Sequence, residues 1–291
     1  SGKLRLVYIK HASSLIKMKV AVVIAGFAPR SFRYTYKSIL HHIIRPLQSA
    51  GHTVSTYHFS FTSTKSFIDT PPSRGDDARY HLDNRDAYLM KDCKVETEVQ
   101  EALDADLRSH PFSQRLGGQI ARQGLQLTRL NAARSLYQEK CAFNLVDCDP
   151  DVCVFTYNEV LFLQDINVRQ VERAALDRRL IFVADNGWAS GGIEDGFYVT
   201  SWPNAYKIGT RYDSYLGNCT RKLGNFETEF QARVLELGLD IQVTSMPKVK
   251  IRTGGLIKPG PSRAGFVQRR AYAHLMTKGR LDLEKIGAVY R

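Results

Sequence analysis

The chain has 291 residues and a formal net charge of +12, and 43% of its residues are hydrophobic and 24% charged. These values are ordinary for a folded globular protein and fit one large α/β domain or two small ones. No run of about 18 apolar residues occurs, which argues against a membrane-spanning helix, and five cysteines without a C-x-x-C pair argue against a disulfide framework or a structural zinc site.

The first 17 residues stand apart from the folding pattern. Ser1-Gly2 looks like the scar of a removed purification tag, and Met18 fits a native start because a strand pattern begins directly after it. We therefore expect residues 1–17 to be a tag scar or leader extension and residues 18–291 to form a single domain.

Residues 19–61 predict a βαβ unit. Lys19–Ala25 is an almost wholly apolar, β-branched run, which is typical of a strand buried on both faces. Apolar residues at helical spacing predict a helix over Tyr34–Ala50, which Pro46 ends or kinks. His52–Phe61 then alternates like a second strand, so the order is strand, glycine-containing turn, helix, strand.

The rest of the chain continues this alternation after a long polar excursion over residues 62–92. Further helices are predicted at Lys94–Leu107, Gly118–Cys141, Pro203–Tyr215, Asn225–Leu237 and Gly265–Thr277. Further strands are predicted at Asp151–Thr156, Arg179–Ala184, Ile241–Val243 and Lys248–Arg252. Together these elements predict an α/β domain.

The positive charge is concentrated near the end of the chain. Residues 248–291 carry eleven Lys or Arg and two acidic residues, whereas residues 18–247 are close to neutral. A basic segment of this kind suits a small anionic ligand such as a nucleotide diphosphate, and it suits nucleic acid or an anionic membrane surface almost as well.

Three places in the sequence are candidates for a ligand site, because ligands of open α/β sheets bind beyond the carboxyl ends of the strands. The first is the turn after the first strand, formed by Ala25, Gly26 and Phe27. Glycine permits close backbone approach, and Arg30 and Arg33 offer forked donors for a diphosphate near a helix N-terminus. The turn has no Walker or G-x-G-x-x-G pattern, which argues against an ATPase or a Rossmann dehydrogenase.

The second place is the end of the strand at Asp151–Thr156, where Asn158 and Glu159 follow. Glu159 is the carboxylate best placed to bind a donor diphosphate through a divalent ion, since such ions prefer oxygen ligands. Two Asp-x-Asp triplets, at residues 147–149 and 149–151, precede the strand and so belong to the opposite edge of the sheet.

The third place is the segment ADNGWASGGIEDGFY at residues 184–198. It combines Asp185, Glu194 and Asp195 with aromatic residues and four glycines, a mixture that suits sugar binding. One of these carboxylates could act as general base on an acceptor hydroxyl. The expected acceptor-binding aromatic residues are Trp188, Tyr198 and Trp202.

Three segments carry a resemblance to a known family: VVIAGFAPRSFRYTYKSILHHIIRPL, DVCVFTYNEVLF and IFVADNGWASGGIEDGFYVTSWPNAYKIGTRYDSY. They resemble GT-A-like glycosyltransferases of algae, plants, bacteria and large DNA viruses, in particular the chlorovirus enzymes that build capsid glycans, including a xylosyltransferase. The resemblance implies a GT-A-like, Rossmann-type mixed sheet flanked by helices. The cysteine pattern favours a reducing, intracellular setting, so we expect a cytoplasmic location, which is the host cytoplasm for a viral enzyme.

The resemblance further implies roles for the three places. The turn at Gly26 and the 157–159 triplet would bind a nucleotide sugar, with a UDP-sugar favoured, and Mn²⁺ or Mg²⁺ could assist at Glu159. The triplet departs from the family's Arg-x-Asp pattern. In an enzyme that inverts configuration and transfers a sugar such as xylose to a glycan hydroxyl, Asp195 would be the first choice of general base and Glu194 the second.

Two other functions stay open from the sequence. A nucleic-acid-binding protein would explain the basic charge, although no recognised nucleic-acid motif is present. A sulfotransferase-like enzyme would share the α/β fold and the phosphate-binding arginines, although Pro29-Arg30-Ser31 fits its usual phosphate loop poorly.

Overall fold

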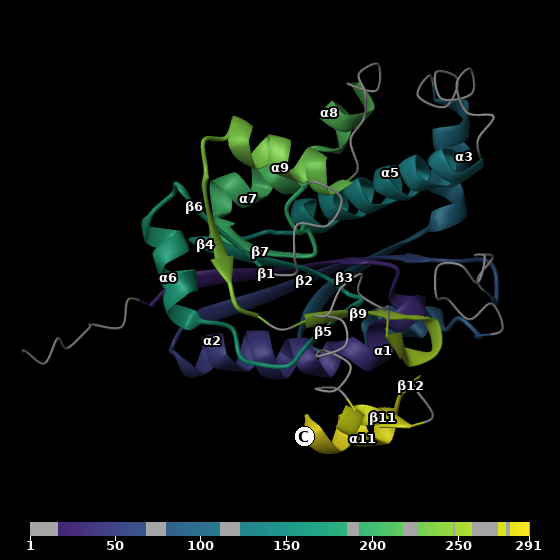
Figure 1. Ribbon diagram of the computed structural model, residues 1–291, viewed down its shortest axis with the longest axis horizontal. Helices are drawn as coiled ribbons and strands as arrows, with labels where there is room; N and C mark the ends of the chain where they lie inside the picture. The colour runs from purple at the N-terminus through teal and green to yellow at the C-terminus, as the bar shows by residue number, and fades with distance from the viewer. Residues whose placement is uncertain are drawn as a thin grey trace, which may run out of the picture.

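A seven-stranded mixed sheet in the order β3-β2-β1-β4-β7-β6-β8 forms the centre of the computed structural model (Figure 1). The structure describes residues 17–67, 80–110, 123–184, 192–217, 226–246, 248–257, 273–277 and 280–290. The strands are β1 Lys19–Gly26, β2 Thr53–Thr62, β3 Cys93–Val99, β4 Val152–Tyr157, β6 Leu180–Ala184, β7 Phe197–Ser201 and β8 Asp240–Thr244. β7 runs antiparallel to both of its neighbours, and the other paired strands are parallel.

The two central strands are buried because their sequences are apolar on both faces. Every residue of β4 is buried, as is every residue of β1 after Lys19. β1 pairs with β4 over Val20–Ala25, so both strands end at the same edge of the sheet. That carboxyl edge is where ligands of open α/β sheets bind.

Helices cover both faces of the sheet (Figure 1). On one face lie α1 Ala28–Ile39 and α2 Arg45–Ser49, and on the other lie α5 Gln123–Asn144, α7 Trp202–Gly209 and α9 Phe226–Glu236. The remaining α-helices are α3 Gln100–Ser109, α6 Val168–Leu176, α8 Tyr212–Gly217 and α11 Leu283–Val289. The 3₁₀ segments are η3 Asn84–Tyr88, η5 Thr253–Gly255 and η6 Ala273–Leu275. The predicted fold class, an α/β domain with a mixed sheet flanked by helices, is confirmed.

A π-helical turn, η1 Leu40–Ile44, joins α1 to α2 and accommodates Pro46. Proline has no N–H to give to the carbonyl four residues before it, which here belongs to His42. The His42 carbonyl instead accepts from the Ile166 N–H at 2.8 Å. The helix therefore continues past Pro46 to Ser49 instead of ending there.

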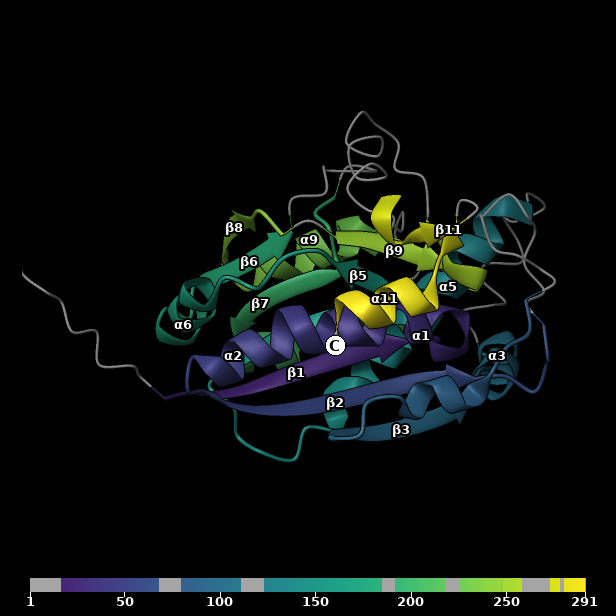
Figure 2. The same cartoon turned by 90° about the horizontal axis from the view of Figure 1, so that it is seen from below.

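A small second sheet lies beside α1 (Figures 1 and 2). It consists of β5 Val160–Phe162, β9 Lys248–Arg252 and β10 Leu256–Ile257, with β9 in the middle and antiparallel to both partners. The short hairpin β11 Met276–Thr277 and β12 Arg280–Leu281 leads to α11, which packs on α1. The described part of the basic tail thus packs against the body of the domain.

Most predicted elements are confirmed. The elements that were not predicted are α6, α11, β5, β7, β10, β11 and β12. The helix predicted at Gly265–Thr277 is wrong at its end, which is β11, and residues 265–272 lie outside the described residues. The helix predicted at Lys94–Leu107 is wrong in its first half, which is the edge strand β3, because alternate side chains face solvent there. β5 and β7 were not predicted, since both are short and follow polar turns. The predicted Pro203–Tyr215 helix is divided into α7 and α8.

Candidate functional site at the carboxyl edge of the sheet

The ends of β1 and β4 are joined directly. The Asn158 N–H donates to the Ala25 carbonyl at 2.8 Å, and the Asn158 side chain packs against Gly26. A Cβ at Gly26 would collide with the Asn158 amide, and the backbone φ of +140° also favours glycine. The predicted residues Ala25, Gly26 and Asn158 therefore lie together, and the last two are fitted to each other.

The Asn158 side chain is part of this joint. It is 1% exposed, and its Nδ2 lies 3.3 Å from His58 Nε2 on β2. Burial lowers the pKa of His58 to about 4, so this imidazole is neutral at ordinary pH. The Asn158 amide thus follows β4, packs against the end of β1 and contacts His58 of β2. Phe27 follows at the N-cap of α1.

Glu159 holds two arginines at this edge. Its Oε2 accepts from Arg252 Nη1 at 2.9 Å and lies 3.4 Å from Arg30 Nη1. Arg30 is on the first turn of α1, whereas Arg252 ends β9 and follows Glu159 by 93 residues. All three side chains are partly exposed, so a ligand can reach them.

Glu194 and Asp195 precede β7 and lie beside the face of β9 that carries Lys248 and Lys250. Glu194 Oε1 lies 3.0 Å from Lys248 Nζ and 3.7 Å from Lys250 Nζ, and it accepts from the Gly196 N–H at 3.1 Å. Asp195 is 3% exposed. Because side chains alternate along a strand, Lys248, Lys250 and Arg252 project to one side of β9 as a basic row.

The two neighbouring carboxyls have opposite electrostatic environments. Burial disfavours the Glu194 carboxylate, but Lys248 and Lys250 outweigh it and lower the pKa to about 2. Burial raises the pKa of Asp195 to about 7, against the attraction of Lys250 and with added repulsion from Glu194. Asp195 is therefore able to take up a proton near neutral pH, and Glu194 is not.

A buried ionic network lies beneath the site on the α5 side. Glu139 accepts from the Tyr157 hydroxyl and from Arg211 Nη1, the latter at 2.5 Å. Glu139 is fully buried and Arg211 is 6% exposed. Lys250 Nζ lies 6.0 Å from the centre of the Tyr157 ring. Because Tyr157 is hydrogen-bonded to Glu139, the network holds the ring against which Lys250 packs.

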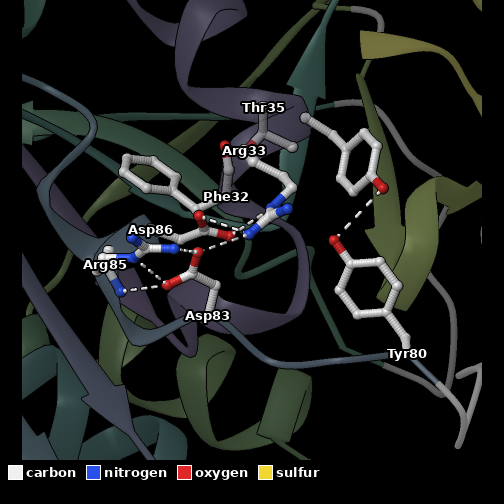
Figure 3. A network of polar contacts seen from close by, with 8 residues as sticks. Phe32, Arg33, Thr35, Tyr80, Asp83, Arg85 and Asp86 are labelled. Atoms are coloured by element: carbon white, nitrogen blue, oxygen red, sulfur yellow. Dashed lines mark hydrogen bonds and ion pairs between the residues drawn. The ribbon is translucent and has the colours of Figure 1, made fainter.

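Arg33 forms ion pairs with acidic residues in η3 and at its N-cap (Figure 3). Its Nε donates to Asp86 at 2.7 Å and its Nη2 at 3.0 Å, and Nη2 also lies 3.5 Å from Asp83. Tyr80 faces Tyr34 of the same helix, with their hydroxyls 3.5 Å apart. Arg33 thus links α1 to η3 through Asp86, whereas Arg30 of the same helix pairs with Glu159.

Neither of the two aromatic candidates that the structure describes presents its ring to a ligand beside the carboxylates. Tyr198 is fully buried, and its ring stacks on Phe155 at 4.8 Å. Trp202 starts α7 at the opposite edge of the sheet, where its N–H donates to the Asp151 carbonyl. Asp185 and Trp188 lie outside the described residues.

The basic row of β9 is the part of the site that the sequence reasoning missed. The segment KVKIR was predicted as a strand and counted only as part of a basic tail. Its alternation of cation and aliphatic residue was the available signal, because a period of two puts all three cations on one face. The partners of this face were not readable from the sequence.

Some carboxylate and histidine groups lie away from this edge and contact none of the residues of the candidate site that are described above. Asp147 and Asp151 lie before β4, as predicted, where Asp147 accepts from Lys94 and Asp151 accepts from the Lys19 N–H. Among the described residues, His41, His42 and Asp165 form a group whose ligand atoms lie within 4.8 Å of one another, at the far end of α1. No described helix is long and apolar enough to cross a membrane.

Comparison with solved structures finds the crystal structure of mouse xyloside xylosyltransferase 1 in its apo form, at 10% sequence identity and a TM-score of 0.38. The match covers 79% of this chain and 85% of that chain. No protein-family model matches the sequence, and no curated protein matches it. The residues of the site, rather than this likeness, therefore carry the functional proposal.

Proposed function

We propose that the protein is a glycosyltransferase that transfers a sugar from a nucleotide sugar, with a UDP-sugar favoured, to a hydroxyl of a glycan. The observation that carries the proposal is the pair formed by Asp195, a buried carboxyl with a pKa of about 7, and the cationic row of β9. Xylose is the candidate sugar and a capsid glycan the candidate acceptor, as in the enzymes that the sequence resembles.

The cations suit the diphosphate of the donor. Arg30 and Arg252 approach one carboxylate oxygen from two elements, so their remaining N–H groups converge on the same region. Guanidinium groups bind phosphate oxygens with two parallel hydrogen bonds. Gly26 ends β1 before Arg30, and Asn158 fills the space beside it, so the β1–α1 turn is held next to Glu159.

Asp195 suits the acceptor. In the proposed reaction its carboxylate removes the proton of the acceptor hydroxyl as the oxygen bonds to the anomeric carbon, and the bond to the nucleotide diphosphate breaks. Positive charge from Arg30, Lys250 and Arg252 stabilises the leaving diphosphate. Attack opposite the leaving group inverts the anomeric configuration. Glu194 is a poorer base, because two lysines lower its pKa and with it its affinity for a proton.

Asp195→Asn should lower kcat by about 10²–10⁴-fold, the range for a lost general base, while UDP affinity changes little. The assay is release of UDP from UDP-sugars with glycan acceptors, beside calorimetric titration of UDP. For the unchanged protein we expect kcat/KM to rise with pH through about pH 7, because the base acts when it is deprotonated.

Glu194→Gln is the comparison at the neighbouring carboxyl: it should keep the rising limb but move it to lower pH, because it removes the repulsion by which Glu194 raises the pKa of Asp195. An Asp195→Asn protein with full turnover would remove Asp195 from the mechanism. The titration also includes adenosine 3′,5′-bisphosphate and a nucleic-acid duplex. Binding of either one, without UDP or another nucleotide diphosphate, would replace the glycosyltransferase proposal.

A further inference from the structure

We infer that the site binds a diphosphate through side-chain cations alone, with Arg30, Lys250 and Arg252 occupying the place of a divalent ion and Glu159 positioning the two arginines. This inference rests on the proposed function for the identity of the nucleotide, and it revises the role that the sequence gave to Glu159.

The donor set around Glu159 does not fit a divalent cation. Mn²⁺ and Mg²⁺ need several oxygen ligands around one point. Here the Oε2 atom of Glu159 is already shared by the guanidinium groups of Arg252 at 2.9 Å and Arg30 at 3.4 Å. A cation bound to that oxygen would lie against two positive groups, which repel it.

The other carboxylates of the cluster, within the part of the chain that the structure describes, do not supply the missing ligands. Glu194 Oε1 is shared by Lys248 and Lys250, at 3.0 and 3.7 Å. Asp195 lies within the field of Lys250, whose positive charge also opposes a divalent cation there. Around Glu159 the cluster has three cations, Arg30, Lys250 and Arg252, so the charge next to this carboxylate is positive. Such a cluster attracts a diphosphate and disfavours Mn²⁺ or Mg²⁺.

The backbone fixes the cationic row before any ligand arrives. β9 pairs with β5, which starts directly after Glu159, in the register Val160↔Lys250. The Ile251 N–H donates to the Glu159 carbonyl at 2.7 Å. Glu159 therefore holds β9 through its backbone and Arg252 through its side chain. Because an arginine has five N–H donors, both guanidinium groups can keep Glu159 and still bind phosphate oxygens.

The test is calorimetric titration of inorganic pyrophosphate and of UDP, each in EDTA and again with Mn²⁺. Both probes should bind in EDTA, and Mn²⁺ should change the UDP Kd by less than about threefold. Arg252→Gln should weaken both probes by about 10–100-fold, the loss of one charge-assisted hydrogen-bonded contact. Arg179→Gln, the same substitution at an exposed position before β6, should leave both Kd values unchanged.

Glu159→Gln separates a positioning residue from a metal ligand. As a positioning residue, its amide oxygen still accepts from an arginine, so UDP should bind in EDTA with a Kd within about fivefold of the unchanged protein, less than a lost charged contact costs. The inference is overturned if UDP binds only with Mn²⁺ and Glu159→Gln abolishes that binding, an outcome that leaves the glycosyltransferase proposal standing. Pyrophosphate binding in EDTA that is lost in Arg252→Gln supports the inference even where no nucleotide binds.

Discussion

Glu194 and Asp195 show how the same side-chain chemistry takes two roles at adjacent positions. Lys248 and Lys250 hold Glu194 as a carboxylate, whereas burial raises the pKa of Asp195 to about 7. The sequence indicated both residues as candidates but could not rank them by charge state. The lysines that decide the ranking lie more than fifty residues later and are brought close only by the β5–β9 pairing.

Glu194→Gln should lower the free energy of unfolding by about 3–5 kcal/mol at pH 7, because Lys248 is 1% exposed and would remain buried without its carboxylate. The pKa of Glu194 is lowered when the protein folds, so the stabilisation is present above its ordinary value of 4.5 and is lost as the pH falls toward 2. Urea unfolding at pH 7 and pH 3 measures both effects.

The double variant Glu194→Gln with Lys248→Met is the control for this pair, because it removes both charges and should recover most of the lost stability. A double variant as unstable as the single one would show that the loss comes from packing rather than from the unpaired lysine.

The location of a single residue could be predicted where backbone geometry determines it. It could not be predicted where a partner far away in the sequence determines it. Gly26 and Glu159 follow from the rule that the ends of parallel strands share an edge. Arg33 has the same chemistry as Arg30, but Asp86 engages it from a different segment. Tyr198 reads as a sugar-binding residue from its neighbours, yet β7 turns its ring into the core, stacked on Phe155.

Elements were predicted best where burial on both faces makes the apolar run continuous. β1 and β4 follow from KVAVVIAG and VCVFTY, in which nearly every residue is buried. β3 lies at the edge of the sheet and alternates polar residues, so its composition resembles that of a helix. β5 has only three residues, too few for a periodic signal, although it positions β9.

The packing of α7 on α5 depends on a glycine. A methyl group at Gly209 would collide with the Phe143 ring, whereas at Gly217, the last residue of α8, it would meet no described atom within 4 Å. Gly209→Ala should therefore destabilise the fold by about 1–3 kcal/mol through overpacking. Gly217→Ala should be neutral or stabilise it by up to about 1 kcal/mol through the unfolded chain.

Urea unfolding of the two glycine variants compares the same substitution in two short helices. Equal stability of the two would mean that α7 shifts away from Phe143 without loss, and the close contact would then contribute nothing specific.

At the scale of the whole molecule, the structure has a large core around the main sheet and a small core around β9 and the C-terminal elements. The small core contains Val249 and Ile251, which project from β9 opposite to the cationic row, together with Leu281, Ile286 and Tyr290. The Tyr290 hydroxyl also donates to the Phe162 carbonyl of β5 at 3.1 Å. The sequence predicted a basic tail, but not that its described end supports the strand carrying the cations.

Ile286→Ala tests this support. Ile286 is 1% exposed, so its truncation should cost about 2–5 kcal/mol of stability and should weaken pyrophosphate binding by loosening the packing behind β9. Leu283→Ala, on the exposed side of the same helix, should cost less than about 0.5 kcal/mol and leave binding unchanged. Unchanged pyrophosphate affinity in Ile286→Ala would show that packing in the small core does not affect binding by the β9 cations.

The two signs of charge in the site are also separated along the chain. Glu139, Glu159, Glu194 and Asp195 all come before residue 200, whereas Arg211 and the β9 row follow it, and only Arg30 precedes both groups. During synthesis, N-terminal regions fold first. A nascent chain made only as far as residue 247 therefore has Glu159 and Glu194 without Arg252, Lys248 and Lys250, the β9 cations that pair with them in the folded protein.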